Sequence, residues 1–487
     1  MTINYLYIIK TLGSILILET VFLLMATFVA FADDGNDRVP MLVSSGIMLA
    51  GGISFFLTGR KANEYQAGRR EGMLTVALTW IVLSFFGMLP FLTGGYINNV
   101  TDAFFETMSG YTTTGATVIN DLEALPRGIL FWRSLIQWQG GIGVVVFTVA
   151  LLPMFGGGAS YLYDSETTGF SHDRFRPRVT QVAKRLSGIY MALTLIVALL
   201  LWAGPMDFFD AINHAMSSVS TGGYSTKNTS VAFWDSAYTE YVLIFAMCAG
   251  SLKLTVIYFA FKGDFKQLRR DEEIRWFMSY MLFFIVITVG WLFYKGYRIP
   301  GDDMEDTIRR AAFQIISIVS TTGFTVVDYV GWGQFFWLIA VVLMLVCGCG
   351  GSTSGGIKVG RAMIAVKNII NEFRKQTHPT AILPVRINGK SIPQDIIHRV
   401  HIFILVYLLI IAVSWAILLL NGLTFDEALG TAMTAISNVG PSLGLFESGN
   451  VYRIPDTAKW YVAFLMLVGR LELFTILTIL LPGFWRR

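Results

Sequence analysis

Ten long apolar runs limit what this sequence can fold into more than any other feature. Most of them reach the length of about 18 residues at which an apolar helix crosses a lipid bilayer. Charged residues make up only 14% of the chain, whereas about a quarter is usual in soluble domains. Because every backbone N–H and C=O in lipid must find an internal hydrogen bond, we expect an all-α integral membrane protein with ten transmembrane helices. The predicted spans are residues 8–31, 41–58, 73–94, 129–154, 186–203, 237–261, 277–296, 335–361 (with a break), 399–421 and 459–482.

Basic residues gather at every second connection between these runs. Cytoplasmic loops of membrane proteins carry such an excess of Lys and Arg, so we predict that these connections and both termini are cytoplasmic. The basic residues form separate short blocks instead of one patch, and we therefore expect no nucleic-acid partner. The blocks are 59–70, 172–185, 261–275, 358–399 and the final pair Arg486 and Arg487, which together hold 24 of the 37 Lys and Arg residues.

A short polar turn interrupts the apolar sequence four times, at intervals of about a hundred residues. Each turn follows an apolar segment of 10 to 14 residues, which is too short to span a bilayer and has the length of a re-entrant helix. Each segment opens with an acidic residue, which suits a helix N-terminus through capping and the helix dipole. The four segments are 102–111, 210–219, 306–319 and 426–437.

The recurring order of span, short helix, polar turn and span predicts four related units around a common axis. Repeated units in one chain usually build one object, so the four turns are expected to meet at its centre. The predicted divisions are an N-terminal two-helix extension at 1–70 and pore repeats at 71–160, 161–268, 269–385 and 386–487, with pseudo-fourfold symmetry.

Four polar turns at the centre of a ring are typical of an ion filter. Glycine permits the backbone angles that aim successive carbonyls in one direction, and carbonyl rings replace the hydration shell of a permeating cation. The turns carry no carboxylate, which favours a monovalent ion over Ca²⁺ or Mg²⁺. A single copy would be an ordinary helix-ending turn, but four copies favour the filter. The predicted ion-binding residues are Thr113, Thr114, Gly115, Ser220, Thr221, Gly222, Thr321, Thr322, Gly323, Asn438, Val439 and Gly440.

A run of glycines and hydroxyl residues breaks the eighth span. Glycine in a helix costs about 1 kcal/mol relative to alanine, so a continuous helix is not expected at 348–356. We predict a flexible loop below the filter that obstructs the pore, and the alternative is a kinked helix stabilised by its neighbours. The residues assigned to this gate are Gly350, Gly351, Ser352, Thr353, Ser354, Gly355 and Gly356.

Two basic residues fall inside predicted spans. Intramembrane arginine is costly and indicates function, so Arg470 is predicted to face the pore near the loop and to repel cations in the closed state. The alternatives are a structural pairing with Glu472 or a contact to loop carbonyls. For Lys253 the alternatives left open are an undefined role in the pore and extension of its side chain to the cytoplasmic interface.

Five stretches carry a resemblance to the Trk/Ktr superfamily of potassium transporters. The two extra N-terminal spans point to its TrkH branch, and the resemblance runs through the whole chain in order. The sequence "AGSLKLTVIY" around Lys253 departs from the family pattern, which more often has an Asn-Phe-containing stretch there. The matching stretches are "QWQGGIGVVVFTVALLPM" (137–154), "FDAINHAMSSVSTGGYST" (209–226), "AAFQIISIVSTTGF" (311–324), "GCGGSTSGGIKVGR" (348–361) and "GRLELFT" (469–475).

The resemblance implies potassium uptake across a bacterial inner membrane through a pseudo-fourfold pore. It also implies a homodimer in membrane lipid and a cytoplasmic TrkA-type ring that binds nucleotides and controls opening. The Gly-rich stretch matches the family's intramembrane gating loop. K⁺ is then the transported ion, and no bound organic cofactor is expected on this chain.

Two other functions are alternatives to an ion pore. A secondary transporter of an organic solute would use broken helices, but its halves would be related by inversion, unlike four repeats of one orientation. An intramembrane enzyme would need a nucleophile paired with a base. Ser352 and Ser354 have no histidine partner within the membrane sequence, so we expect no enzymatic activity.

Overall fold

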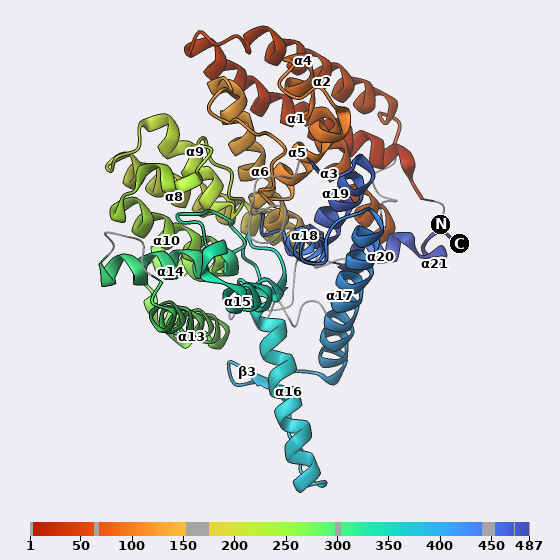
Figure 1. Cartoon of the computed structure of the whole chain (residues 1–487). Helices are drawn as coiled ribbons and strands as arrows, with labels where there is room; N and C mark the ends of the chain where they lie inside the picture. Colours follow the sequence, from red (N-terminus) through yellow and green to blue (C-terminus); the bar gives the residue numbers. More distant parts are fainter. Residues whose placement is uncertain are drawn as a thin grey trace.

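The computed structural model describes residues 3–62, 68–151, 175–297, 303–440, 453–471 and 473–486 (Figure 1). Within these ranges the regular structure is almost entirely helical, which confirms the all-α prediction. Strands form two small sheets. Parallel β1 and β2 are Val346–Cys347 and Ile357–Lys358, and antiparallel β3 and β4 are Arg386–Ile387 and Lys390–Ser391.

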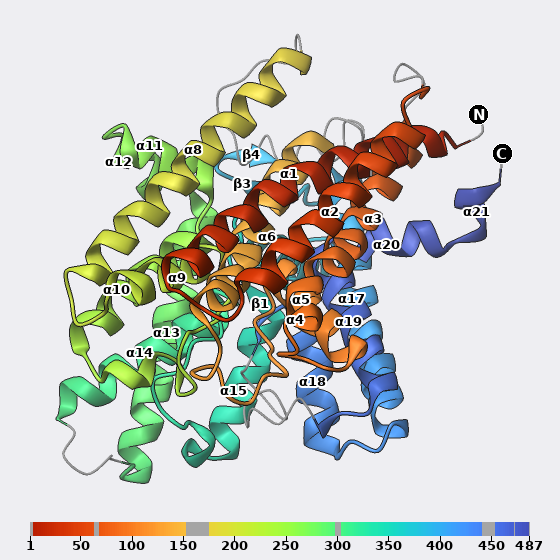
Figure 2. The same ribbon diagram turned by 90° about the horizontal axis from the view of Figure 1, so that it is seen from above.

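Two N-terminal helices, α1 (Tyr5–Ala32) and α2 (Arg38–Thr58), lie side by side along one flank of the molecule (Figure 2). They approach closely at Gly13, where a Cβ would overlap the backbone of Gly52 and Phe56. Small residues permit such close packing between membrane helices. These two helices precede the first of the repeated units.

The order of long helix, short helix, polar turn and helix then recurs four times. The first unit contains α3 (Arg69–Gly87), α4 (Leu89–Thr93), α5 (Val100–Tyr111) and α6 (Arg127–Leu151). The second contains α8 (Phe175–Trp202), α9 (Phe208–Val219), α10 (Ala237–Ser251), α11 (Leu254–Phe261) and α12 (Phe265–Arg270). The third contains α13 (Glu272–Lys295), α14 (Met304–Val319), α15 (Gln334–Leu345) and α16 (Val359–Thr377). The fourth contains α17 (Gln394–Leu420), α18 (Phe425–Ser437), α19 (Asp456–Arg470), α20 (Leu473–Leu480) and α21 (Pro482–Trp485).

Six helical stretches among the described residues are long and apolar enough to cross a membrane, and two sharply bent pairs raise the number to eight. The other two predicted spans correspond to the 25-residue α6 and to the 12-residue α15, after which the predicted break follows. The bends are 115° between α10 and α11 and 118° between α19 and α20. The predicted spans at 237–261 and 459–482 are therefore present as bent helix pairs.

The bend between α10 and α11 lies at Leu252 and Lys253. Both residues adopt extended backbone, with ψ of 163° and 119°. The Lys253 ammonium lies buried against Asp271 and Glu273, so the chain turns to bring the charge to its partners. Sequence hydropathy contains no sign of this requirement.

The short helices α5, α9, α14 and α18 begin as the sequence predicts, with an acidic residue in the first turn. These residues are Asp102, Asp210, Asp306 and Asp426. The caps themselves lie just upstream in two clear cases: the Asn99 side chain accepts from the Thr101 N–H, and the Asp207 side chain from the Asp210 N–H. Such caps satisfy N–H groups that would otherwise lack a partner.

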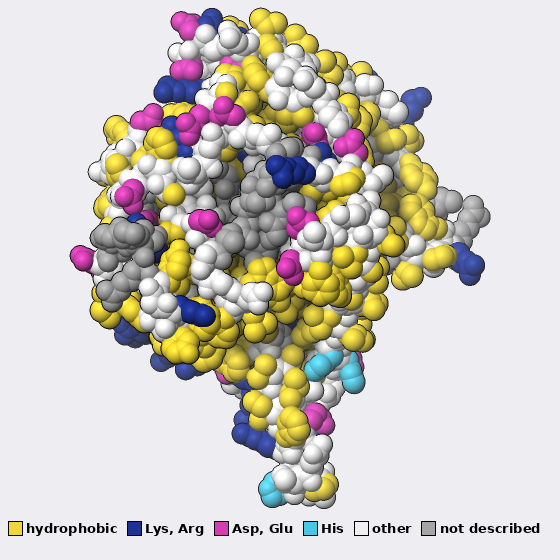
Figure 3. Space-filling view, viewed as in Figure 1, with side chains coloured by type: hydrophobic (Ala, Val, Ile, Leu, Met, Phe, Trp, Pro, Cys, Tyr) yellow, Lys and Arg dark blue, Asp and Glu magenta, His cyan; other side chains and the backbone are white. Residues whose placement is uncertain are grey.

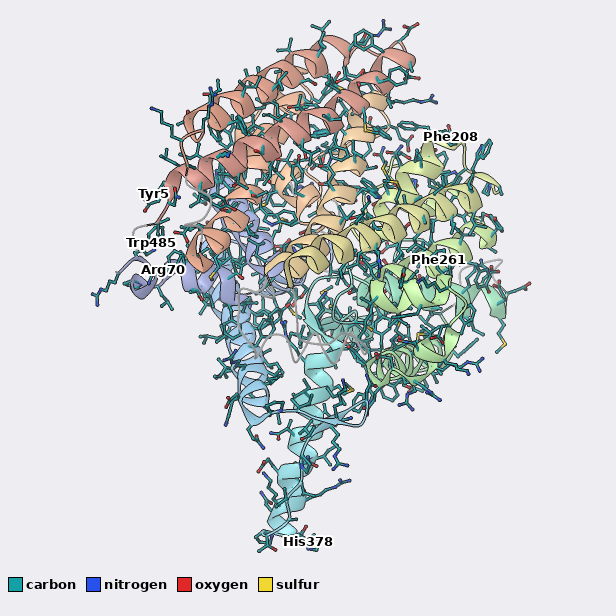
Figure 4. All side chains as sticks on the ribbon, turned by 180° about the vertical axis from the view of Figure 1, so that it is seen from behind. Tyr5, Arg70, Phe208, Phe261, His378 and Trp485 are labelled. Atoms are coloured by element: carbon teal, nitrogen blue, oxygen red, sulfur yellow. The ribbon has the colours of Figure 1, made fainter. Side chains whose placement is uncertain are left out.

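The basic segment 358–399 forms an ordered projection instead of a simple connection. Helix α16 extends away from the helical body, with His378 at its tip (Figure 4), and strand β3 lies beside the part of α16 nearer the body (Figure 1). Figure 3 shows hydrophobic side chains over the flanks of the body and charged or histidine side chains on this projection. The two chain ends lie close together (Figure 1), and Arg70 Nη1 donates to the Arg486 carbonyl at 3.0 Å.

Candidate ion pathway

The four polar turns share one backbone conformation. In each turn a residue other than glycine takes a left-handed conformation, which is uncommon for such residues, and a glycine with positive φ follows two positions later. The left-handed residues are Thr113, Thr221, Thr321 and Asn438, with φ of 52°, 56°, 63° and 54°. The glycines are Gly115, Gly223, Gly323 and Gly440, with φ of 83°, 79°, 84° and 75°. This recurrence shows that the four turns are structural repeats.

The second turn is shifted by one residue from its predicted register. The prediction aligned Gly222 with Gly115, but Gly223 has the equivalent conformation. The N–H of Gly222 donates to the carbonyl five residues back, as do the N–H groups of Thr114, Thr322 and Val439. Gly222 is therefore the equivalent of Thr114, and the predicted triplet Ser220-Thr221-Gly222 is corrected to Thr221-Gly222-Gly223. Two adjacent glycines made the register ambiguous in the sequence.

Contacts between neighbouring turns follow the order of the repeats. A Cβ added at Gly115 would overlap the Gly222 carbonyl oxygen, and one at Gly223 would overlap that of Thr322. A Cβ at Gly440 would overlap the Thr114 carbonyl oxygen, which brings the fourth turn against the first. These contacts link the first turn to the second, the second to the third and the fourth to the first.

Side chains reinforce the contact between the fourth and first turns. Asn438 Nδ2 donates to Thr114 Oγ1 at 2.9 Å and to the Met466 carbonyl at 3.0 Å. Thr114 Oγ1 also lies 2.9 Å from Thr112 Oγ1. In the third turn, Thr322 Oγ1 is likewise 2.8 Å from Ser320 Oγ. These hydroxyls hold the turns in shape.

Gln137 of α6 supports the second turn and was missed by the sequence reasoning. Its Nε2 donates to the Gly222 carbonyl at 2.8 Å, and its Oε1 accepts from Ser217 Oγ at 2.7 Å and from the Tyr224 N–H at 3.1 Å. The partners of the Gln137 amide lie about 85 positions away in sequence, so no local sequence pattern indicates this role. The role becomes visible only in the folded structure, where Gln137 is fully buried beside the second turn.

A buried ion pair lies behind the first turn. Arg133 Nε is 2.9 Å from Glu106 Oε1, and the two side chains are 1% and 0% exposed. Glu106 Oε2 also accepts from the Val118 N–H at 3.0 Å, and Arg133 Nη1 donates to the Ser225 carbonyl at 3.2 Å. The pair therefore connects the first pore helix with the segments that follow the first and second turns.

The glycine-rich segment 348–356 forms a loop closed at its base by the parallel strands β1 and β2. Thr353 Oγ1 lies 3.1 Å from the Val219 carbonyl and 3.0 Å from that of Gly250, both in the second unit. The Gly355 N–H donates to Thr321 Oγ1 at 2.9 Å. A loop in direct contact with turn residues replaces the alternative of a kinked helix.

Arg470 joins this loop to the first unit. Its Nη1 donates to the Thr353 carbonyl at 2.6 Å and its Nη2 to the Gly140 carbonyl at 3.0 Å, and the residue is only 4% exposed. Contact with loop carbonyls, one of the alternatives in the sequence, is thus present. Glu472, the other considered partner, lies outside the described residues.

Lys253 is buried in an ion-pair cluster. It is 2% exposed, and its Nζ lies 2.7 Å from Glu273 Oε2 and 3.1 Å from Asp271 Oδ2. Among the described residues, no group of three or more His, Cys, Asp or Glu side chains is placed to hold a metal ion.

A family model, TrkH, described as "Cation transport protein", matches residues 45–482. The chain belongs to the TrkH family. Membership in a family of transport proteins identifies it as a membrane transport protein and not an enzyme.

Named relatives cover nearly the full chain. The Trk system potassium uptake protein TrkH of Vibrio parahaemolyticus is 35% identical over 487 residues, covering 98% of this chain and 99% of the relative. TrkH of Escherichia coli K12 is 35% identical, with 90% and 91% covered. The crystal structure of the potassium transporter TrkH from Vibrio parahaemolyticus superposes with a TM-score of 0.90 at 32% identity, covering 99% of this chain and 100% of that one.

Proposed function

We propose that this chain takes up potassium ions through a selective pore formed where the four turns meet. The observation that carries the proposal is the series of contacts between neighbouring turns, from Gly115 to Gly222, Gly223 to Thr322 and Gly440 to Thr114. A ring of backbone at membrane depth is tolerated where it lines a water-filled path. The names of the relatives, potassium uptake proteins, give the ion.

In this proposal, backbone carbonyls of the turns coordinate the ion. The N–H groups of the first two residues in each turn bond back into their own pore helices, and hydroxyls bond within the first and third turns. The turn carbonyls, of which that of Gly222 also accepts from Gln137 Nε2, are the groups that replace water around a dehydrated cation. The proposed filter comprises Thr113, Thr114, Gly115, Thr221, Gly222, Gly223, Thr321, Thr322, Gly323, Asn438, Val439 and Gly440, with Ser220 at the end of its pore helix.

The loop and Arg470 form the proposed gate. The loop contacts the second and third units through Thr353 and Gly355. A buried guanidinium fixed on the Thr353 carbonyl adds a positive charge that opposes cation passage in a low-dielectric setting. Opening then requires both the loop and Arg470 to move away from the contacts that they make in this structure.

We also propose a homodimer in a bacterial inner membrane, controlled by a cytoplasmic TrkA-type nucleotide-binding ring. The words "Trk system" in the relatives' names support an assembly with further components. The basic projection around α16 supports a cytoplasmic side for this face and for both termini. Its exposed position provides a site where a soluble regulator can bind.

The test is uptake of ⁸⁶Rb⁺ into proteoliposomes that contain the purified chain, driven by an outward K⁺ gradient. External K⁺, Na⁺ and a mixture of amino acids are the competitors. Uptake that K⁺ inhibits strongly and Na⁺ weakly is expected. Inhibition by amino acids, or solute flux without Rb⁺ flux when a nucleotide-binding ring is also present, contradicts the pore and favours the alternative of an organic-solute transporter.

A further inference from the structure

We propose that Glu273, paired with buried Lys253, is a positioning residue that ties the start of the loop to the first turn of α16 and holds the gate closed. The assignment of the loop as a gate rests on the proposed function. The clamp itself rests on the contacts of Glu273 and Lys253, and the sequence around Lys253 departs from the family pattern.

One carboxylate joins the start of the loop to the first turn of α16. Glu273 Oε1 accepts from the Gly350 N–H at 2.7 Å and from the Gly360 N–H at 3.0 Å. These donors lie on either side of Thr353, and Glu273 is 4% exposed. A Cβ at Gly360 would lie 2.8 Å from Glu273 Oε1, so the chain carries glycine where the carboxylate needs room. Hydrogen bonds to an ionised acceptor are about twice as strong as neutral ones.

The other carboxylate oxygen holds Lys253. Its Nζ lies 2.7 Å from Glu273 Oε2 and 3.1 Å from Asp271 Oδ2, all within the protein interior. The last turn of α10 just before this lysine also accepts from the loop: the Ser251 carbonyl binds the Cys349 N–H at 2.9 Å. Burying such a cluster of charges is costly. Here the Lys253 charge is paired with both carboxylates, and one of them, Glu273, also binds the loop at Gly350.

The residue beside Glu273 connects the same helix turn to the cytoplasmic projection. The Glu272 N–H donates to Asn388 Oδ1 at 2.8 Å, and Glu272 Oε2 accepts from the Asn388 N–H at 3.1 Å. Glu272 also pairs with Lys367 of α16. Adjacent residues in the first turn of α13 thus hold the loop and the β3–β4 hairpin. Displacement of the hairpin is expected to shift the clamp and release the loop.

The native cysteine Cys349 reports directly on loop release. It is fully buried and its N–H is held by α10, one residue before Gly350. In a background with Cys248→Ser and Cys347→Ser, the rate of labelling by a membrane-impermeant maleimide is measured for Glu273→Gln, Lys253→Met and the double variant. We expect each single variant to label about tenfold faster. The double variant is expected to label no faster than the faster single variant, because the residues act as one unit.

The matched control is Glu372→Gln, which removes an exposed carboxylate paired with Lys375 on α16 and is expected to leave the labelling rate unchanged. A second background that retains only Cys248 separates loop release from general loosening. Its labelling rate should not change in any variant. Glu273→Asp keeps the charge, and its expected intermediate rate keeps the test valid if Glu273→Gln does not fold.

Unchanged Cys349 labelling in folded Glu273 and Lys253 variants overturns the clamp, as does an equal rise at Cys248. Basal ⁸⁶Rb⁺ uptake in the same preparations separates the clamp from the proposed function. Faster labelling with raised, K⁺-selective uptake supports both. Faster labelling without ion flux in any preparation, including the parent chain with a nucleotide-binding ring, supports the clamp and overturns the pore.

Discussion

Single residues with unusual backbone angles set the geometry of the ring. Thr113, Thr221, Thr321 and Asn438 all take the left-handed conformation, which costs a residue with a Cβ about 1–2 kcal/mol. Four repetitions of the same cost indicate that the conformation is required by the turn. Three of the glycines that follow, Gly115, Gly223 and Gly440, carry a second constraint, because carbonyl oxygens of neighbouring turns occupy the space of their missing side chains.

Gly223→Ala is expected to weaken the preference for K⁺ over Na⁺. The new Cβ would overlap the Thr322 carbonyl oxygen, and the backbone φ of 79° adds strain. Displacement of this carbonyl should lower selectivity about tenfold, the effect of roughly 1.4 kcal/mol. The measurement is Na⁺ competition against ⁸⁶Rb⁺ uptake. Gly290→Ala in α13 is the control, since nothing lies within 4 Å of its Cβ. Unaltered selectivity in Gly223→Ala contradicts the assigned register.

Arg470→Gln is expected to raise basal uptake in the absence of a regulator. Glutamine removes the positive charge and cannot bridge the Thr353 and Gly140 carbonyls as the guanidinium does. Loss of charge-assisted hydrogen bonds should increase basal ⁸⁶Rb⁺ flux about tenfold or more. Arg470→Lys retains the charge without the bidentate geometry, and its flux should lie between those of the parent and Arg470→Gln. Reduced flux in folded Arg470→Gln would exclude a role as a barrier.

At the scale of elements, the pore helices and the loop form two layers. Helices α5, α9, α14 and α18 end at the turns, and the loop between β1 and β2 contacts the turns through Thr353 and Gly355. Because β1 pairs with β2 in parallel, the two ends of the loop stay close while its middle can change conformation. The loop is therefore a separable element on a fixed base.

Deletion of residues 352–354 is expected to increase basal flux while K⁺ is still preferred over Na⁺. The deletion removes Thr353 and its contacts to Val219, Gly250 and Arg470, but it leaves the turns intact. Basal ⁸⁶Rb⁺ uptake should rise about tenfold. The control deletes residues 378–380, an exposed stretch of equal length after α16. If both deletions give the same flux, the loop is not the barrier.

Much of this element pattern could be predicted from sequence because it has local causes. Acidic residues at helix starts, a glycine-rich break and four polar turns are each visible within a dozen residues. The bend at Leu252 and Lys253 was not predictable, because it depends on Asp271 and Glu273. Gln137 was missed for the same reason: its partners lie across the fold in the second turn. The limits assigned to the repeats stay predictions.

At the scale of the whole molecule, ion pairs connect one repeat to the next around the outside of the ring. Arg309 of α14 pairs with Glu240 of α10 at 2.8 Å, with side chains 5% and 4% exposed. Lys459 of α19 pairs with Asp102 of α5 at 2.5 Å. These pairs join the third unit to the second and the fourth to the first. The sequence showed their charges but not their partners, because each pair joins residues far apart in the chain.

The Arg309–Glu240 pair should contribute asymmetrically to stability. Arg309 also pairs with Glu305 and Asp306 on its own helix, so Glu240→Leu leaves the guanidinium with partners. Arg309→Leu instead leaves buried Glu240 without its closest cation, a change that costs about 3–5 kcal/mol.

Thermal unfolding in detergent checks this order. We expect the largest loss of stability in Arg309→Leu, a smaller loss in Glu240→Leu, and partial recovery in the double variant, which buries no unpaired charge. Arg38→Ala breaks an exposed pair with Asp34 and should cost at most about 1 kcal/mol. Equal losses in Arg309→Leu and Arg38→Ala would mean that the repeats hold together through helix packing alone.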